Sequence, residues 1–342
     1  MTALAVDQDW TFNASDKRVS ENPNSKSSFS KRLAPTEAQA SACGKAIIVG
    51  EHAVVYGSHA VALPLKQMRL HLTLSPLPRL DKQQIQLTLA GHEASPRVNS
   101  VLTDAMELLG SDPFSLNARS HNSLPIGAGL GSSATLCVAT LRALTSSLGY
   151  ELPSSQLAAY ANELEKRFHG NPSGLDAAVV AYEACILFAK GKPIVPIKLK
   201  VPEGHKGWQF LLIDSSIRAS TMAMIRLAEP YFKGRSGDRH LQSFDQLSWL
   251  VYGALQQGDV TTVGAAMNEC AELLRAASVV PDSLEDMISI CRKIGLPGVK
   301  TTGAGGGGMI LGLLDPAKAD TQEEAVKAAF PEQSVYRVSI ES

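Results

Sequence analysis

The chain has 342 residues, of which 44% are hydrophobic and 19% charged, and its formal net charge is -1. This length and balance are typical of a globular protein with about two domains. The near-zero charge without basic blocks argues against nucleic-acid binding, and Glu183 interrupts the longest apolar run, at 177–189, before it could span a bilayer. Five scattered cysteines without Cys-x-x-Cys spacing predict reduced thiols, a cytoplasmic location and no structural zinc.

The first part of the chain is polar and then becomes strand-like. Residues 1–40 lack lasting periodicity, and we interpret them as a disordered tail or a cloning remnant, with order beginning near Ser41. Short extended pieces are expected at 46–49, 53–56 and 61–65. Residues 69–74 and 84–89 alternate strictly between apolar and polar, which is typical of half-buried strands, and we expect these two strands to pair antiparallel.

A helix over 98–109 and a strand over 115–120 lead to a glycine-rich stretch at 124–134. Its glycines Gly127, Gly129 and Gly131 run into Ser132, Ser133 and an apolar stripe with helical spacing. Glycine allows positive φ and close approach of a ligand, and either serine can cap the following helix, whose free N–H groups favour a phosphate. A plain glycine turn before a capped helix explains this stretch alone equally well.

Two common phosphate-binding motifs are excluded. Neither Gly44-Lys45-Ala46 nor Gly191-Lys192-Pro193 supplies the Gly-Lys-Ser/Thr end of a Walker loop. The run 303–308 formally matches the dinucleotide fingerprint, but a strand-like segment at 309–314 follows it where the fingerprint requires a helix.

The second half mixes helices and strands. Ser154 and Ser155 are expected to cap a further helix, which ends at Gly170. The further expected elements are strands at 185–188, 194–200, 210–214, 309–314 and 334–340, several helices over 220–294, and a helix at 317–329. We place a domain boundary at 202–204, which gives an N-terminal domain over 41–204 and a C-terminal domain over 205–342. Because the elements lack a repeating βα rhythm, the expected fold class is α+β.

Several polar residues are candidates for chemistry. Lys45 is either a solvated charge at a strand end or a cation for a phosphoryl group, and Glu51 with His52 is either a polar turn or part of a site. Glu165 lies near a helix C-terminus, where a carboxylate is unfavourable unless a cation is close, such as a neighbouring Lys or Arg or a magnesium ion. Asp176 is either a helix cap or a functional carboxylate. Together these groups fit phosphoryl transfer.

Four segments strengthen this hypothesis, namely 41–57, 124–134, 169–176 and 299–308. In this order they resemble the motifs of the GHMP small-molecule kinases, and within that family the mevalonate kinase branch. The galactokinase branch fits less well, because Val54-Val55 stands where galactokinases continue with Asp-Tyr. Cys43 departs from the family pattern, which has a proline there, and the spacing around Thr221 differs slightly.

The resemblance implies an N-terminal domain like that of ribosomal protein S5, a ferredoxin-like C-terminal domain and a homodimer. It implies ATP- and Mg²⁺-dependent phosphorylation of the 5-hydroxyl of mevalonate, in isoprenoid synthesis. Alternatives are a kinase for another small alcohol and a catalytically inactive metabolite sensor. In the implied site Asp176 takes the hydroxyl proton, Lys45 stabilises the ionised hydroxyl, and Ser133 and Glu165 hold Mg²⁺. The implied binding residues are Gly127, Ala128, Gly129, Leu130, Gly131, Ser132 and Ser133 for ATP, Lys45, Glu51, His52, Asp176 and Thr221 for mevalonate, and a second glycine loop of Gly303, Ala304, Gly305 and Gly306.

Overall fold

The computed structural model describes residues 34–78, 83–125, 127–204 and 206–341. Most of the predicted N-terminal tail, residues 1–33, lies outside the described residues. The first strand begins at Ala38, somewhat ahead of the expected start of order.

The first sheet is built around two long antiparallel strands, β1 (Ala38–Val49) and β2 (Ala60–Pro76). The other strands of this sheet are β3 (Ile85–Leu89), β4 (His92–Glu93), β5 (Leu116–Asn122), β6 (Ile186–Phe188) and β7 (Val195–Pro196). The expected antiparallel pairing of 69–74 with 84–89 is wrong, because β5 lies between β2 and β3 and runs parallel to β3. Alternation determines which side chains face the core, but it does not determine the neighbouring strand.

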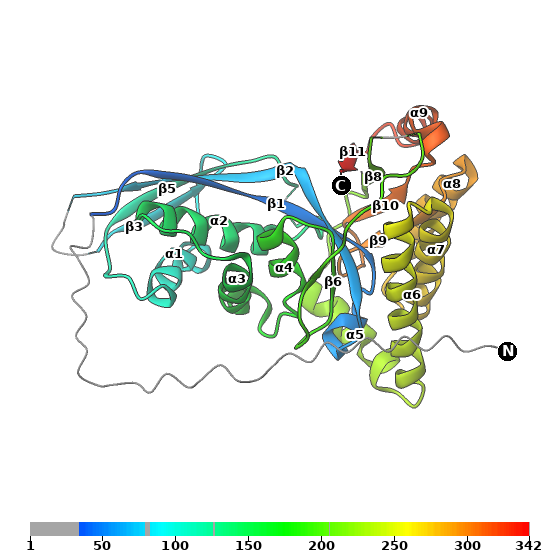
Figure 1. Cartoon of the computed structure of the whole chain (residues 1–342), viewed down its shortest axis with the longest axis horizontal. Coiled ribbons are helices and arrows are strands. Elements are labelled where there is room, and N and C mark those ends of the chain that lie inside the picture. Colours follow the sequence, from blue (N-terminus) through cyan, green and yellow to red (C-terminus); the bar gives the residue numbers. More distant parts are fainter. Residues whose placement is uncertain (1–33, 79–82, 126, 205, 342) are drawn as a thin grey trace. The chain divides into compact units, whose positions relative to one another are not determined.

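Four helices cover one face of this sheet: α1 (Pro96–Leu108), α2 (Ser132–Ser147), α3 (Ser154–His169) and α4 (Leu175–Tyr182) (Figure 1). Alternate residues of β2, Leu70, Leu72 and Leu74, are buried in one cluster with Cys137 and Leu141 of α2. The predicted strand alternation and helical stripe therefore meet in a common core.

The second half carries a four-stranded sheet in the order β11-β8-β10-β9. Its strands are β8 (Trp208–Asp214), β9 (Gly298–Thr302), β10 (Met309–Leu313) and β11 (Val335–Ile340). The helices are α5 (Thr221–Lys233), α6 (Gly237–Gln257), α7 (Val260–Ala276), α8 (Asp282–Ile294) and α9 (Ala319–Ala329). The predicted strands at 210–214, 309–314 and 334–340 and the α+β class are confirmed.

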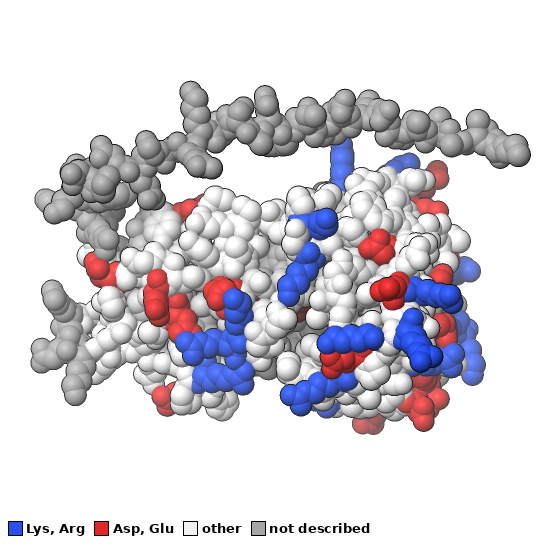
Figure 2. All heavy atoms as spheres, turned by 90° about the horizontal axis from the view of Figure 1, so that it is seen from below, with Lys and Arg blue, Asp and Glu red and all other residues white. Residues whose placement is uncertain are grey.

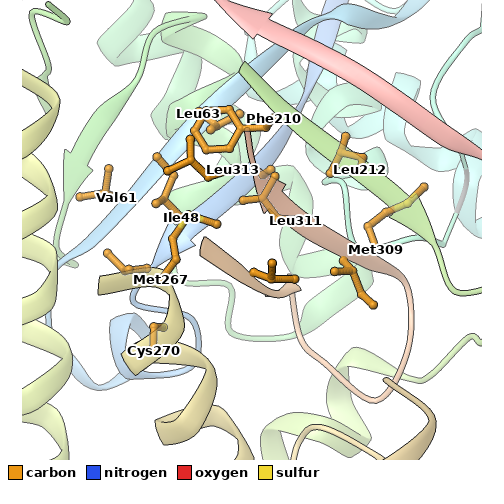
Figure 3. Packing of buried hydrophobic residues seen from close by; sticks show 14 of the residues in the cluster. Ile48, Val61, Leu63, Phe210, Leu212, Met267, Cys270, Met309, Leu311 and Leu313 are labelled. Atoms are coloured by element: carbon orange, nitrogen blue, oxygen red, sulfur yellow. The ribbon is translucent and has the colours of Figure 1, made fainter. Parts of the chain in front are cut away.

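One hydrophobic cluster joins the two sheets (Figure 3). Ile48 of β1 and Leu63 of β2 pack in it with Phe210 of β8, Leu311 of β10 and Met267 of α7. The close packing holds the end of β1 against the second sheet. The residues that follow Ile48 are therefore fixed in position relative to the loop between β9 and β10.

Three local predictions need correction. Residues Ala53–Tyr56 were expected to be extended, but they form a 3₁₀ helix, η1. A second short 3₁₀ helix, η2, covers Pro316–Lys318. The expected serine caps are absent from α2 and α3, because Gly131 and Pro153 occupy the cap positions and the serines are the first helical residues.

Cysteine chemistry and charge follow the predictions made from composition. All five cysteines are free and buried, as expected for reduced thiols. Across the described part of the chain, the helices are too short or too polar to cross a bilayer. Figure 2 shows basic and acidic side chains interspersed on the face it draws, without a continuous field of one sign.

Candidate active site

A cavity of about 400 Å³ brings together residues from distant parts of the chain. The predicted site residues that line it are Lys45, Glu51, His52, Gly127, Gly129, Gly131, Ser132, Ser133, Glu165, Asp176, Thr221, Gly303 and Ala304. Ala128 and Leu130 are instead buried in the hydrophobic core. Gly305 and Gly306 pack closely against Val279 and Met224. A cavity of this size is typical of a small-molecule site.

The first glycine loop turns sharply into α2. Gly127, Gly129 and Gly131 have φ angles of 72°, 81° and 75°, which a residue with a Cβ adopts only under strain. No side chain caps α2, so the N–H groups of its first turn are free for a ligand. A helix N-terminus with free donors beside a cavity is suited to a phosphate.

The second glycine loop, residues 303–308, packs backbone to backbone against the first. A Cβ on Gly303 would lie 2.9 Å from the carbonyl oxygen of Gly129, and a Cβ on Gly129 would lie 3.1 Å from that of Thr302. A Cβ on Gly308 would lie 2.7 Å from the carbonyl oxygen of Ala128. The glycines in both loops therefore allow the two loops to meet at one wall of the cavity.

Lys45 and Asp176 form an ion pair in the cavity, with Nζ 3.1 Å from Oδ2. Lys45 Nζ also donates to the carbonyl oxygen of Gly129 at 3.2 Å, and its stem crosses Gly131 so closely that a Cβ there would lie 2.9 Å from Cγ. The lysine side chain is 3% exposed and that of Asp176 is 31% exposed. Asp176 can thus accept a proton from an entering hydroxyl while Lys45 stabilises the resulting negative charge.

Glu165 is a buried carboxylate next to this pair. Ser133 Oγ donates to Glu165 Oε1 at 2.9 Å, and burial together with the charge of Asp176 raises the pKa of Glu165 to about 8. The two cations considered from the sequence are engaged elsewhere, because Lys166 pairs with Glu163 and Arg167 with Asp104.

A magnesium ion fits this pair of oxygen donors. Mg²⁺ binds one or two carboxylates together with water and substrate phosphates, and Ser133 and Glu165 offer a hydroxyl and a buried carboxylate that lacks a full counter-charge. Groups of three or more His, Cys, Asp or Glu side chains able to form a self-contained metal site are absent among the described residues. The geometry therefore suits an ion shared with a phosphate.

His169 is a site residue that the sequence interpretation did not assign. Its Nε2 lies 3.0 Å from Ser133 Oγ, and burial lowers its pKa, which favours the neutral ring. Because Ser133 donates to Glu165, the neutral His169 ring donates to Ser133 from Nε2. The spacing of four residues between Glu165 and His169 on one helix is the signal that could have identified it.

His52, Glu51 and Thr221 also line the cavity. His52 Nε2 lies 2.8 Å from the carbonyl oxygen of Ala304, and Thr221 is the first residue of α5. Glu51 borders the cavity, but its carboxylate bonds to the buried ammonium of Lys300, a residue to which the sequence interpretation gave no role.

A glycine loop at a helix N-terminus, a lysine–aspartate pair and a buried carboxylate are together the arrangement expected in a small-molecule kinase. The family model described as GHMP kinases N terminal domain matches residues 97–184, and the model described as GHMP kinases C terminal matches residues 251–332. The chain belongs to the GHMP kinases.

Several of the similar proteins are mevalonate kinases. The chain is 29% identical over 307 residues to the mevalonate kinase of Aeropyrum pernix, covering 84% of this chain and 92% of that one. It is 28% identical over 326 residues to the mevalonate kinase of Pyrococcus horikoshii, covering 88% and 96%. The crystal structure of L. major mevalonate kinase in complex with R-mevalonate has the same fold, with a TM-score of 0.75, at 23% identity over 91% of this chain and 98% of that one.

Proposed function

We propose that this protein transfers the γ-phosphoryl group of ATP to the 5-hydroxyl of mevalonate, giving 5-phosphomevalonate and ADP in isoprenoid synthesis. The single observation that carries the reaction type is the Lys45–Asp176 pair beside the glycine loop of α2. The choice of mevalonate as the substrate follows from the relatives. These are named mevalonate kinase and are similar to this chain over most of its length.

The chemical step uses the ion pair directly. The 5-hydroxyl oxygen forms a bond to the γ-phosphorus, the bond from that phosphorus to the bridging oxygen of ADP breaks, and the hydroxyl proton passes to Asp176. Lys45 lowers the energy of the ionised hydroxyl and of the charge that develops on the γ-phosphate. Its low exposure strengthens this effect, because water screens the interaction less.

The nucleotide side is assigned to the glycine loop. The backbone N–H groups from Gly127 to Ser132 and the N-terminus of α2 receive the ATP phosphates. Ser133 and Glu165 would hold Mg²⁺, and His169 orients the Ser133 hydroxyl. When bound, Mg²⁺ neutralises charge on the β- and γ-phosphates.

Mevalonate is assigned to the side of the cavity lined by His52 and Thr221, with Ala304 on the second glycine loop closing it. Val54, Val55 and Ile225 supply apolar surface there, which suits the methyl and methylene groups of a small branched acid. Glu51 contributes to this side indirectly, because its bond to Lys300 affects the backbone around His52.

The test is ADP release from ATP and Mg²⁺ with mevalonate, phosphomevalonate, galactose and homoserine offered separately. Asp176→Asn is measured in parallel, because it keeps the shape of the side chain and removes the base. We expect turnover with mevalonate alone, reduced by about 10²- to 10⁴-fold in the variant, with ATP binding retained. Turnover with another alcohol would keep the kinase and change its substrate. ATP binding without turnover of any alcohol would point to a metabolite sensor.

Assembly and location are further parts of the proposal. A homodimer is implied by the family resemblance, and sedimentation velocity at several protein concentrations distinguishes it from a monomer. A cytoplasmic location accords with five free, buried thiols.

A further inference from the structure

The backbone at His52 makes a rare tight turn. His52 has φ 59° and ψ -51°, and the N–H of Ala53 donates to the carbonyl oxygen of Glu51 at 2.6 Å. This is a γ-turn with positive φ at its central residue, a strained conformation for a residue with a Cβ. Such a conformation persists only where the surrounding contacts hold it, and both Glu51 and His52 make such contacts.

The first contact is an ion pair inside the protein between Glu51 and Lys300. Their side chains are 1% and 0% exposed, and Lys300 Nζ donates to Glu51 Oε1. The same ammonium donates to the carbonyl oxygens of Thr301 at 2.5 Å and Ile47 at 3.4 Å, so all three of its N–H donors are used. The turn is therefore anchored from β9 by a charge that has no access to water.

The second contact comes from the glycine loop that follows β9. A carbonyl oxygen only accepts, so the His52 nitrogen that lies 2.8 Å from Ala304 carries the proton, and Nε2 is the donor. Burial lowers the pKa of His52, which keeps the ring neutral and leaves Nδ1 as an acceptor. The ring also stacks on Phe232 of α5 at 6.4 Å between centroids.

We propose that Lys300 is a positioning residue for the alcohol site, acting through the Glu51 carboxylate to hold the γ-turn that presents His52. The identity of the alcohol in this inference rests on the proposed function. The contacts of Lys300, Glu51 and His52 do not depend on it. Lys300 and Ala304 lie on one continuous segment, so the second half of the chain sets both the backbone and the ring of His52. The ring then offers Nδ1, which selects a ligand that donates a hydrogen bond, such as a hydroxyl group.

The main test variant is the double substitution Glu51→Met with Lys300→Met. Lys300→Met alone leaves a buried carboxylate without its cation, a change that can prevent folding, whereas replacing both partners by apolar residues of similar size is tolerated far better. We expect the double variant to fold, to keep the KM for ATP, and to raise the KM for mevalonate by about 10- to 100-fold. If Lys300→Met folds, its KM for mevalonate agrees with that of the double variant within about twofold, because both act through one turn.

Glu183→Gln is the matched control, since it breaks another ion-pair network in the first half of the chain, at Arg69 and Arg142. It should lower the melting temperature and leave the KM for mevalonate unchanged. A double variant whose KM for mevalonate stays within about twofold of the wild-type value overturns the positioning role.

The position of the His52 ring provides a readout that does not depend on substrate. In ¹H–¹⁵N spectra of the wild-type protein, with the signal assigned by its loss in His52→Gln, we expect a protected Nε2–H on a neutral ring. Loss of that protection in the double variant supports the proposal, and an unchanged signal overturns it. If the wild-type enzyme does not phosphorylate mevalonate, the proposed function fails, and this spectrum still decides the role of Lys300.

Discussion

The contact between the two glycine loops predicts the effect of adding a single methyl group. Gly303 has φ 88°, and a Cβ there would lie 2.9 Å from the carbonyl oxygen and 3.1 Å from the Cα of Gly129. Gly295 has a similar φ of 94°, but a Cβ there would have no atom within 4 Å. Gly303→Ala and Gly295→Ala therefore share the conformational penalty and differ in the steric one.

The magnitudes follow from these two terms. Alanine with positive φ costs about 1–2 kcal/mol, which is the whole expected loss for Gly295→Ala. Forcing a methyl group against backbone that cannot rotate away costs about 1–3 kcal/mol more. Gly303→Ala should therefore lose about 2–5 kcal/mol of unfolding free energy. Because the strain falls on Gly129, which lies in the loop proposed to bind the ATP phosphates, it should also raise the KM for ATP.

Urea unfolding of both variants measures the stability difference, and initial rates at varied ATP concentration measure the effect on the site. We expect Gly295→Ala to keep the wild-type KM for ATP at its lower stability. Equal stability losses in the two variants, with an unchanged KM for ATP in Gly303→Ala, would refute the close packing of the two loops.

Two further predictions concern carboxylates. Glu165→Gln keeps the hydrogen bond from Ser133 but removes the charge proposed to bind Mg²⁺, so the Mg²⁺ concentration for half-maximal activity should rise at least tenfold. An unchanged Mg²⁺ titration would contradict this role. Burial tends to raise the pKa of Glu183, but hydrogen bonds from Arg69 and Arg142 outweigh it and lower that pKa. The pairing therefore stabilises the fold above the ordinary pKa of a glutamate, and this stabilisation is lost as pH falls through the lowered value. Glu183→Gln should cost about 1.5–3 kcal/mol at pH 7 and progressively less below about pH 4, as measured by urea unfolding at both pH values.

The sequence predicted elements well wherever the signal was local. Apolar periodicity located α1 and β8, and the class of fold followed from the order of the elements. It could not give the pairing of β3 with β5, because that neighbour is chosen by packing between segments about thirty residues apart. The sequence interpretation also missed η1. Its apolar residues predict a strand, but the γ-turn at His52 directs the chain into a helical turn.

For the site, the sequence predicted residue types more readily than contacts. Lys45, Glu165 and Asp176 were proposed from their motifs, and the structure places all three around one cavity. The contacts of these residues could not be predicted from neighbouring positions alone. Glu165 was expected near a cation, either a neighbouring Lys or Arg or a magnesium ion, and only the resemblance linked it to Ser133, from whose hydroxyl it accepts a hydrogen bond in the structure. The sequence interpretation gave Lys300 no role, because a lysine in a strand is normally solvated. Its burial depends on the carboxylate of Glu51, which is far away in the sequence.

The end of β1 connects the residues of both halves that are proposed to take part in one reaction. Lys45 extends from it toward the glycine loop of α2, and a few residues later His52 meets the second glycine loop. Between them, the N–H of Ile47 donates to Thr302 Oγ1 at 2.8 Å, which ties the strand to β9. A shift of β9 would therefore move Lys45, proposed for the phosphate, and the turn at His52, proposed for the alcohol, together. Because an in-line transfer tolerates little error in the separation of its two reactants, tying both binding sides to one strand is a direct way to keep that separation constant.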